Sequence, residues 1–124
     1  MQERHKNRLV YFKELSITSK NYFIPYIQNW FSVEPGINVL EIGCGDGGNL
    51  LPFSEMGCNT IGVDIAASRI KDAQIFFKAA HAKGRFIAQD IFLLKELEQN
   101  FDIIICHDVL ELSLIHISEP TRPY

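Results

Sequence analysis

A run of closely spaced glycines follows an apolar segment and constrains the fold more than any other feature of the chain. The run reads VLEIGCGDGG from Val39 to Gly48, and it fits two spacings, G-x-G-x-x-G and E-x-G-x-G. Glycine lets the backbone adopt left-handed turns and pass close to another group. The segment therefore predicts a strand, a tight glycine turn and a helix, in that order.

Strands and helices are expected to alternate after this turn, and the alternation indicates a parallel sheet. A helix is expected over 66–83, because apolar residues recur there at helical spacing until Gly84. Alternation of this kind is typical of α/β proteins with a doubly wound parallel sheet. The expected strands are 37–42, 59–64, 85–90 and 101–108, and a short helix is expected over 92–99.

Residues 1–32 are expected to form a helical leader before the sheet. Four apolar side chains near its end recur at helical spacing, which predicts that they pack against the sheet. They are Phe23, Ile27, Trp30 and Phe31. A separate, shorter helix is expected over 8–15, and Pro25 fits the first turn of the second helix. The basic cluster RHKNR at residues 4–8 is interpreted as solvent-exposed.

Composition argues against several classes of protein. The chain has 124 residues and a formal net charge of −3, so we expect one small domain and no nucleic-acid surface. Its three cysteines form no C-x-x-C pair and no zinc spacing, which predicts reduced thiols, a cytoplasmic location and no metal. No apolar run is long enough for a membrane helix, and the polar N-terminus does not resemble a secretory signal.

Polar residues gather where the expected strands end. In sheets of this kind, ligands bind at the carboxyl ends of the strands, near the point where the strand order reverses. The glycine run follows the first strand, and carboxylate or imidazole groups follow the others. These groups are Asp64, Asp90, His107 and Asp108.

Two carboxylates beside the glycine run bear on the class of ligand. A pyrophosphate is held by bare amides and a helix N-terminus, and neighbouring carboxylates would repel it. Glu41 and Asp46 therefore favour a ligand with an amino group and a sulfonium. Asp64 does not discriminate, because it lies 21 positions after Gly43, where an acidic residue can hold ribose hydroxyls in either class.

Four segments in order resemble the motifs of class I methyltransferases that depend on S-adenosylmethionine (SAM). VLEIGCGDG resembles the first motif, GVDIA the second, AQDI the third and FDIIICHDVLE the fourth. The resemblance covers about residues 33–111. It implies a Rossmann-like fold, SAM as the cofactor and S-adenosylhomocysteine as its product.

The resemblance also implies roles for individual residues. Asp64 would bind the ribose, with Ile65 beside the adenine. Asp90 would face the adenine amino group, Ile91 would pack on the ring, and His107 would line the methionine end. The implied cofactor-binding residues are Glu41, Gly43, Cys44, Gly45, Gly47, Asp64, Ile65, Asp90, Ile91 and His107.

Several of these residues also have a purely structural interpretation. Asp64 and Asp90 could cap the helices that follow them. His107 could be a hydrogen-bonded core histidine. Glu41 needs a partner, because it ends an apolar strand. Cys44 is interpreted as a small filler, since no activating base can be named for it.

The function implied by the family is direct transfer of the SAM methyl group to a small-molecule acceptor. The substrate nucleophile attacks the methyl carbon, so the protein mainly supplies alignment and exclusion of water. No catalytic residue is identified apart from His107, the candidate general base for a hydroxyl acceptor. Two other classes stay open, an NAD(P)-dependent oxidoreductase nucleotide-binding domain and a non-catalytic module with the SAM fold.

The end of the chain departs from the family pattern. Residues 112–122 read LSLIHISEPTR, which resembles a translated transposon-type sequencing adapter. We therefore expect a leader at 1–32, a partial SAM-binding domain at 33–111 and a non-native tail at 112–124. On this interpretation the fold is truncated after the fourth of seven expected strands, and the chain is an inactive fragment.

Overall fold

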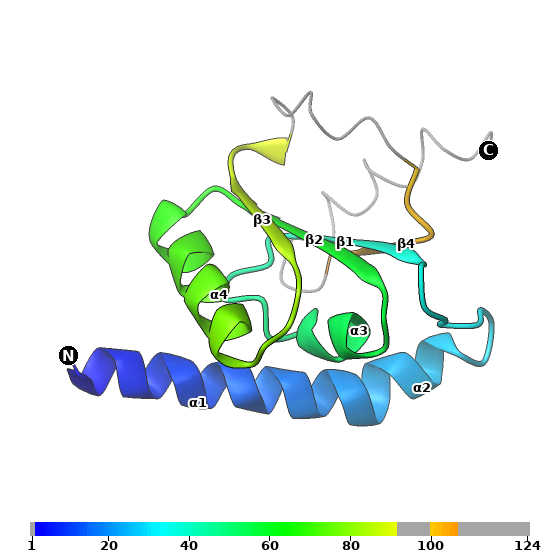
Figure 1. Cartoon of the computed structure of the whole chain (residues 1–124), viewed down its shortest axis with the longest axis horizontal. Helices are drawn as coiled ribbons and strands as arrows, with labels where there is room; N and C mark the ends of the chain where they lie inside the picture. Colours follow the sequence, from blue (N-terminus) through cyan, green and yellow to red (C-terminus); the bar gives the residue numbers. More distant parts are fainter. Residues whose placement is uncertain (1, 92–99, 107–124) are drawn as a thin grey trace.

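The computed structural model describes residues 2–91 and 100–106, and within these ranges four parallel strands form one sheet (Figure 1). The strand order is β3-β2-β1-β4. The prediction of a Rossmann-like α/β sheet is confirmed. The strands are β1 (Asn38–Ile42), β2 (Asn59–Asp64), β3 (Arg85–Ala88) and β4 (Ile103–Ile105).

Strand β1 holds the position that defines the ligand-binding edge. The chain passes from β1 to β2 and β3, and then returns to place β4 on the other side of β1. Parallel pairing aligns Glu41 with Gly62 on one side and with Ile105 on the other. The strand order therefore reverses at β1, and the glycine run follows its carboxyl end directly.

The strand boundaries differ from the sequence prediction except in β2, which has the predicted bounds. β1 begins one residue later than expected. β3 ends at Ala88 rather than at residue 90, and only one further backbone bond, from Gln89 N to Asp64 O, continues its alignment with β2 in the described part of the chain. β4 spans Ile103–Ile105 instead of 101–108. The helix expected over 92–99, His107 and Asp108 lie outside the described residues.

The leader is continuous helix rather than the two separate helices predicted. It consists of α1 (Gln2–Thr18), a π-helical segment η1 (Ser19–Phe23) and α2 (Ile24–Ile27). Pro25 explains the π-helical segment. Its nitrogen cannot donate a hydrogen bond and its ring would clash with the preceding turn, so the turn widens and the Ile24 amide bonds back five residues, to Ser19 O.

The predicted packing of the leader's four apolar side chains is wrong for two of them. Trp30 is 78% exposed and Phe31 is 41% exposed, whereas Ile27 packs against the core. The π-helical segment adds a residue to one turn and shifts the helical phase, and the helix ends at Ile27. Phe12 and Ile24 are buried against the sheet instead.

Helix α4 (Ala67–Ala79) ends earlier than predicted and by a different device. His81 adopts a left-handed conformation with φ of 57°. The Ala82 amide donates to Phe77 O, and the His81 amide donates to Lys78 O, as in a Schellman C-cap. Gly84 does not end the helix. A Cβ at Gly84 would lie 2.8 Å from the Phe77 ring, so this glycine allows close packing.

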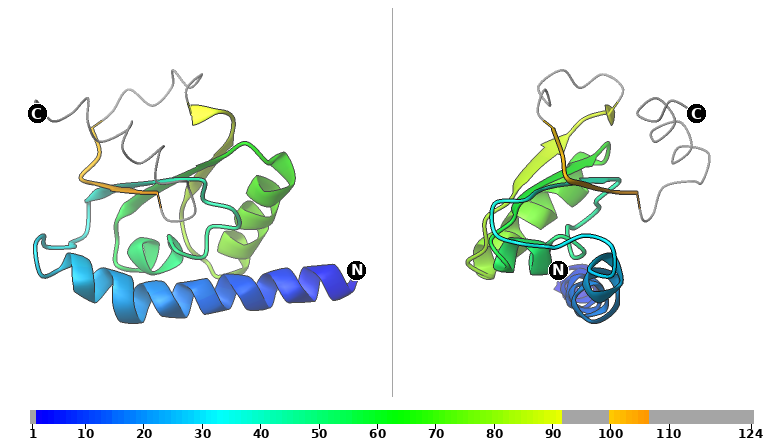
Figure 2. Two further views of the ribbon diagram at one scale, coloured as in Figure 1. Left: turned by 180° about the vertical axis from the view of Figure 1, so that it is seen from behind. Right: turned by 90° about the vertical axis from the view of Figure 1, so that its right-hand side faces the viewer.

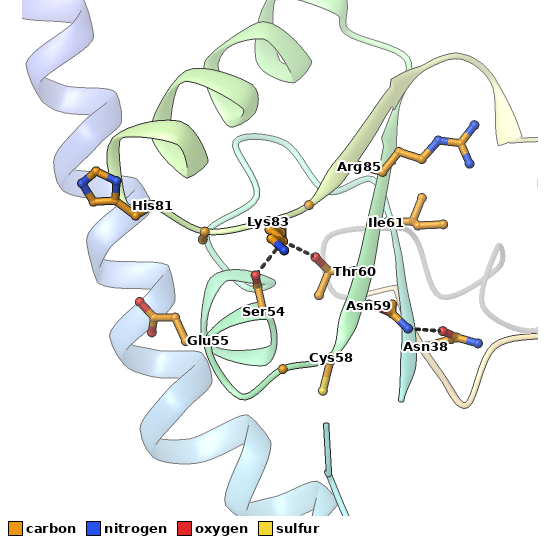
Figure 3. Close-up of a pocket in the computed structure, with 13 residues that line it drawn as sticks. Asn38, Ser54, Glu55, Cys58, Asn59, Thr60, Ile61, His81, Lys83 and Arg85 are labelled. Atoms are coloured by element: carbon orange, nitrogen blue, oxygen red, sulfur yellow. Dashed lines mark hydrogen bonds between the residues drawn. The ribbon is translucent and has the colours of Figure 1, made fainter. Parts of the chain in front are cut away.

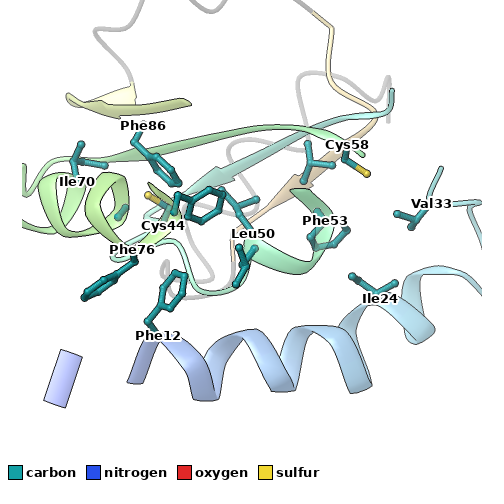
Figure 4. Packing of buried hydrophobic residues seen from close by; sticks show 14 residues of the cluster. Phe12, Ile24, Val33, Cys44, Leu50, Phe53, Cys58, Ile70, Phe76 and Phe86 are labelled. Carbon is teal, nitrogen blue, oxygen red and sulfur yellow. The ribbon is translucent and has the colours of Figure 1, made fainter. Parts of the chain in front are cut away.

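Two apolar clusters lie on opposite faces of the sheet. Helices α1, α3 (Leu51–Glu55) and α4 lie on the same side of the sheet, with α1 running beneath it (Figure 2). The larger cluster fills the space between these helices and the sheet (Figure 4). Its buried members include Phe12, Val39, Leu50, Phe53, Ile70, Ala73, Phe76, Phe77 and Phe86. The second cluster, on the other face, contains Leu40, Ile42, Ile61 and Val63.

Replacing Phe77 with alanine tests this packing. Phe77 is 2% exposed, and its ring lies 4.7 Å from that of Phe86. The cavity left by Phe77→Ala should lower the free energy of unfolding by about 3–5 kcal/mol, measured by urea denaturation. Ile75 is 50% exposed on the same helix, so Ile75→Ala should cost less than about 1 kcal/mol. Equal losses of unfolding free energy in the two variants would contradict the assignment of the buried face. If Phe77→Ala does not fold, the smaller change Phe77→Leu replaces it.

Candidate functional site

The backbone of the glycine run is anchored to the end of β2. The amides of Gly43 and Cys44 both donate to Val63 O, at 2.7 and 3.0 Å, and the Gly47 amide donates to Cys44 O at 3.0 Å. The φ angles of Gly43, Gly45 and Gly47 are 74°, 57° and 86°, which residues with a Cβ rarely adopt. These amides are consumed within the protein, so they do not form the free amide cradle that a pyrophosphate requires.

Asp64 joins the glycine run to the segment that precedes α4. Its Oδ2 accepts a hydrogen bond from the Gly45 amide, and its Oδ1 accepts one from the Ala66 amide, each at 2.9 Å. Ala66 is the N-cap residue of α4, and no side chain caps that helix, so Asp64 is not its N-cap. A carboxylate oxygen can accept a second hydrogen bond, so both oxygens retain capacity for hydroxyl groups.

Glu41 is fully buried beneath the run, where the expected partner is found. Asn49 Nδ2 donates to Glu41 Oε2 at 2.9 Å. Both side chains are at most 1% exposed. The need for a partner, inferred from the apolar strand, is confirmed, because an unpartnered carboxylate at this depth would be costly. Nothing in the sequence pattern singled out Asn49.

Asp46 faces the helices, which corrects the sequence interpretation of its role. Its Oδ1 lies 3.0 Å from Arg8 Nη1 and 3.4 Å from Arg69 Nε, and the residue is 1% exposed. Two guanidinium groups therefore compensate its charge, and Asp46 gives no argument against a pyrophosphate. The anionic character of the ligand edge rests on Glu41 and Asp64.

The leader helix reaches the glycine run at several points. Arg8, expected to be solvent-exposed, has a side chain only 23% exposed. Ser16 Oγ donates to Gly48 O at 2.9 Å, and Ser19 Oγ donates to Asn49 O at 2.8 Å. A Cβ at Gly48 would lie 2.7 Å from Phe12 O, so Gly48 is needed for the approach of α1. The third glycine of G-x-G-x-x-G thus serves helix packing within the chain.

The two cysteines near the strand ends have pKa values that are raised by burial and by nearby negative charge. Burial raises the pKa of Cys44, and the carboxylates of Glu41 and Asp64 raise it further. Burial also raises the pKa of Cys106, with Glu41 adding to the effect. The edge is therefore apolar and anionic, which suits a cationic ligand. Cys44 is 3% exposed, in agreement with its interpretation as a filler.

The remaining predicted site residues are less closely joined to the run. Ile65 follows Asp64 and is 76% exposed, which leaves an apolar side chain open at the ligand edge. Asp90 and Ile91 are half-buried just beyond β3, and Ile91 packs against the second cluster. His107 lies outside the described residues, so its predicted role stays a prediction.

A cavity of about 850 Å³ lies at the opposite edge of the sheet (Figure 3). Asn38, Asn59 and Arg85, which begin β1, β2 and β3, contribute to its lining. Ser54 and Thr60 both donate to Lys83 O within it. The cavity lies where the strands begin, far from their carboxyl ends, so we do not assign the cofactor to it.

Two features are absent from the described residues. No helix among residues 2–91 and 100–106 is long and apolar enough to cross a membrane. In the same ranges, no three histidine, cysteine, aspartate or glutamate side chains come together as a metal site.

Sequence comparison now assigns the chain to a family. The family described as "Methyltransferase domain" matches residues 39–122, more than half of the chain. The chain therefore belongs to the methyltransferase domain family. The resemblance to SAM-dependent methyltransferases, drawn from the four motifs, is confirmed.

Relatives share both sequence and fold with the chain. Ubiquinone biosynthesis O-methyltransferase from Coxiella burnetii is 31% identical over 99 residues, which are 80% of this chain and 40% of the relative. Magnesium protoporphyrin IX methyltransferase from Synechocystis PCC 6803, solved with bound S-adenosylhomocysteine, gives a TM-score of 0.62 at 26% identity over 77% of this chain and 42% of that one. PKMT2 from Rickettsia typhi, solved in complex with AdoHcy, gives a TM-score of 0.60 at 32% identity. The match covers 73% of this chain and 20% of that one. The chain thus spans less than half the length of these proteins.

The sequence did not indicate the side chains that bond to Asp46 and Glu41 within the protein. Arg8 and Asn49 were not selected, because their partners lie 38 and 8 positions away in sequence. One signal was available for the leader. Arg8, Phe12 and Ser19 are spaced 4 and 7 residues apart, the spacing of a single helix face.

Alkylation of the cysteines tests the environment of Cys44. Its pKa is raised above the usual 9.0, so at pH 8 the folded chain holds less Cys44 thiolate than the unfolded chain. Iodoacetamide should therefore modify the partly exposed Cys106 before Cys44, and in urea this difference should vanish, as followed by mass spectrometry. By linkage, the raised pKa favours the folded state below about pH 9, and this contribution declines as the pH rises further. Fast modification of Cys44 in the folded chain would contradict its burial.

Proposed function

We propose that this chain forms the SAM-binding part of a methyltransferase that acts on a small-molecule acceptor. The observation that carries the proposal is the arrangement of Asp64 and the left-handed glycines at the switch point of a parallel sheet. The buried carboxylate of Glu41 favours the cationic SAM over a dinucleotide, and the amides of Gly43, Cys44, Gly45 and Gly47 already have partners within the protein.

The fit of the residues to SAM follows from their chemistry. Asp64 has acceptor capacity for the two ribose hydroxyls, and the exposed Ile65 offers an apolar surface for the adenine. By resemblance, Asp90 would face the adenine amino group and Ile91 would pack on the adenine ring. The methionine end would lie over the glycine run, above Glu41.

The glycine run would contribute through its shape. Gly43, Gly45 and Gly47 would let the cofactor approach the backbone, and the buried Cys44 would keep the loop compact. By resemblance, His107 would line the opening to the acceptor.

Bound SAM supplies an activated methyl group on a sulfonium. The chain's own contribution is to bind and orient that group and to exclude water, so that an acceptor atom can approach in line. No residue in this arrangement forms a covalent bond. A base for a hydroxyl acceptor is not identified among residues 2–91 and 100–106, and His107 remains its candidate.

The acceptor class is inferred from the relatives. Two of them are named for ubiquinone biosynthesis and for magnesium protoporphyrin IX, which supports a small-molecule acceptor for this chain too. The unpaired Cys44, Cys58 and Cys106 are consistent with a cytoplasmic location.

Ligand binding separates this function from the dinucleotide alternative. Isothermal titration of the purified chain with S-adenosylhomocysteine should give a micromolar dissociation constant, about −7 to −9 kcal/mol. NADH should not bind measurably, because the amides of Gly43, Cys44, Gly45 and Gly47 are bonded within the protein and the Glu41 carboxylate would repel a pyrophosphate. Tight binding of NADH, without binding of S-adenosylhomocysteine, would reverse the assignment.

Substitution of Asp64 tests the ribose contact. Asp64→Asn keeps the size of the side chain but removes its charge, and should weaken S-adenosylhomocysteine binding by about 1–3 kcal/mol. Asp102→Asn is the matched control. Asp102 accepts a hydrogen bond from the Asn38 amide at the opposite edge of the sheet, so this variant should bind normally. Unchanged affinity in Asp64→Asn, measured by calorimetry, would remove Asp64 from the site.

A further inference from the structure

We propose that Arg8 positions the glycine run for the cofactor through its ion pair with Asp46. Helix α1 then contributes to cofactor binding, although it does not contact the cofactor. The inference rests on the proposed function, because it concerns how SAM is held. Arg8 is a positioning residue in this scheme, and it acts on the ligand only through the loop.

The charge of Asp46 makes the loop dependent on Arg8. Arg8 Nη1 lies 3.0 Å from Asp46 Oδ1 and 3.5 Å from Asp72 Oδ2, so one guanidinium bridges the loop and helix α4. Among the described side chains, the other cation near Asp46 is Arg69, which is more distant at 3.4 Å and has a side chain that is 36% exposed. Loss of Arg8 would leave a buried carboxylate with one weaker partner, which is strongly unfavourable.

The backbone of the run transmits any movement of Asp46. Asp46 stands between Gly45 and Gly47, which both have positive φ. The Gly45 amide is bonded to Asp64, the proposed ribose ligand. If Asp46 moves towards water to become hydrated, Gly45 is displaced, and the geometry of Asp64 changes with it.

The leader also contacts the end of the run, through one residue of α1 and one of η1. The hydroxyls of Ser16 and Ser19 bond to the carbonyls of Gly48 and Asn49. Arg8, Ser16 and Ser19 lie on one face of the leader, so docking of the helix fixes the middle and the end of the run together. Coupling is reciprocal, so a ligand that requires this loop geometry must also stabilise the docked helix.

Four single variants and one double variant test the inference in the full chain. Arg8→Gln should raise the dissociation constant of S-adenosylhomocysteine by about tenfold, and Arg8→Lys should recover part of the affinity. Asp46→Asn removes the buried charge, so adding Arg8→Gln to it should change affinity by less than about twofold. Lys13→Gln is the control, because Lys13 is exposed on the same helix.

Hydrogen exchange gives a readout that a purely structural role of Arg8 would not move. Binding of S-adenosylhomocysteine should slow exchange of the α1 amides in the native chain, and Arg8→Gln should abolish this protection. If Arg8→Gln does not fold, the double variant with Asp46→Asn takes its place, because it lacks the buried charge of Asp46. Its affinity is then compared with that of Asp46→Asn alone.

The outcomes separate the two proposals. If the native chain does not bind S-adenosylhomocysteine, the proposed function fails. If the native chain binds and Arg8→Gln binds equally well, only the role of Arg8 is overturned. Additive effects of Arg8→Gln and Asp46→Asn on affinity would likewise overturn it, since independent residues do not act through each other.

Discussion

The burial of the Asp46 carboxylate is the constraint around which the cofactor edge is assembled. A carboxylate that is 1% exposed needs cations, and these come from two helices, Arg8 on α1 and Arg69 on α4. The glycine run, the leader and the helix after β2 are thereby tied to one point. The leader is consequently part of the layer that supports the loop, although its sequence shows no binding motif.

The glycines of the run perform different tasks, which resolves the two spacings that the sequence allows. Gly45 and Gly47 adopt left-handed conformations, whereas Gly48 makes room for the backbone of α1 at Phe12. G-x-G-x-x-G is therefore satisfied without a dinucleotide, and the E-x-G-x-G spacing describes the ligand edge, because Glu41 is buried below it.

The polarity of the ligand edge follows from the same arrangement. The amides of Gly43, Cys44, Gly45 and Gly47 are bonded to Val63 O, Cys44 O and Asp64, and so are not available to a phosphate. The pKa of Cys44 is raised by burial first, and then by the carboxylates of Glu41 and Asp64 at the strand ends. The negative charge at this edge suits a sulfonium nucleoside, in agreement with the family.

The sequence by itself determined the order of strands and helices, the bounds of β2 and the positions of the strand-end carboxylates, because local periodicity and glycine spacing are short-range properties. It did not determine the phase of the leader, which the π-helical segment before Pro25 shifted, or the end of α4 at His81 rather than at Gly84. The division of the chain into 1–32, 33–111 and 112–124 stays a prediction. Only the tertiary structure decided that Asp46 pairs with Arg8. Burial and charge pairing between residues 38 positions apart leave no local pattern in the sequence.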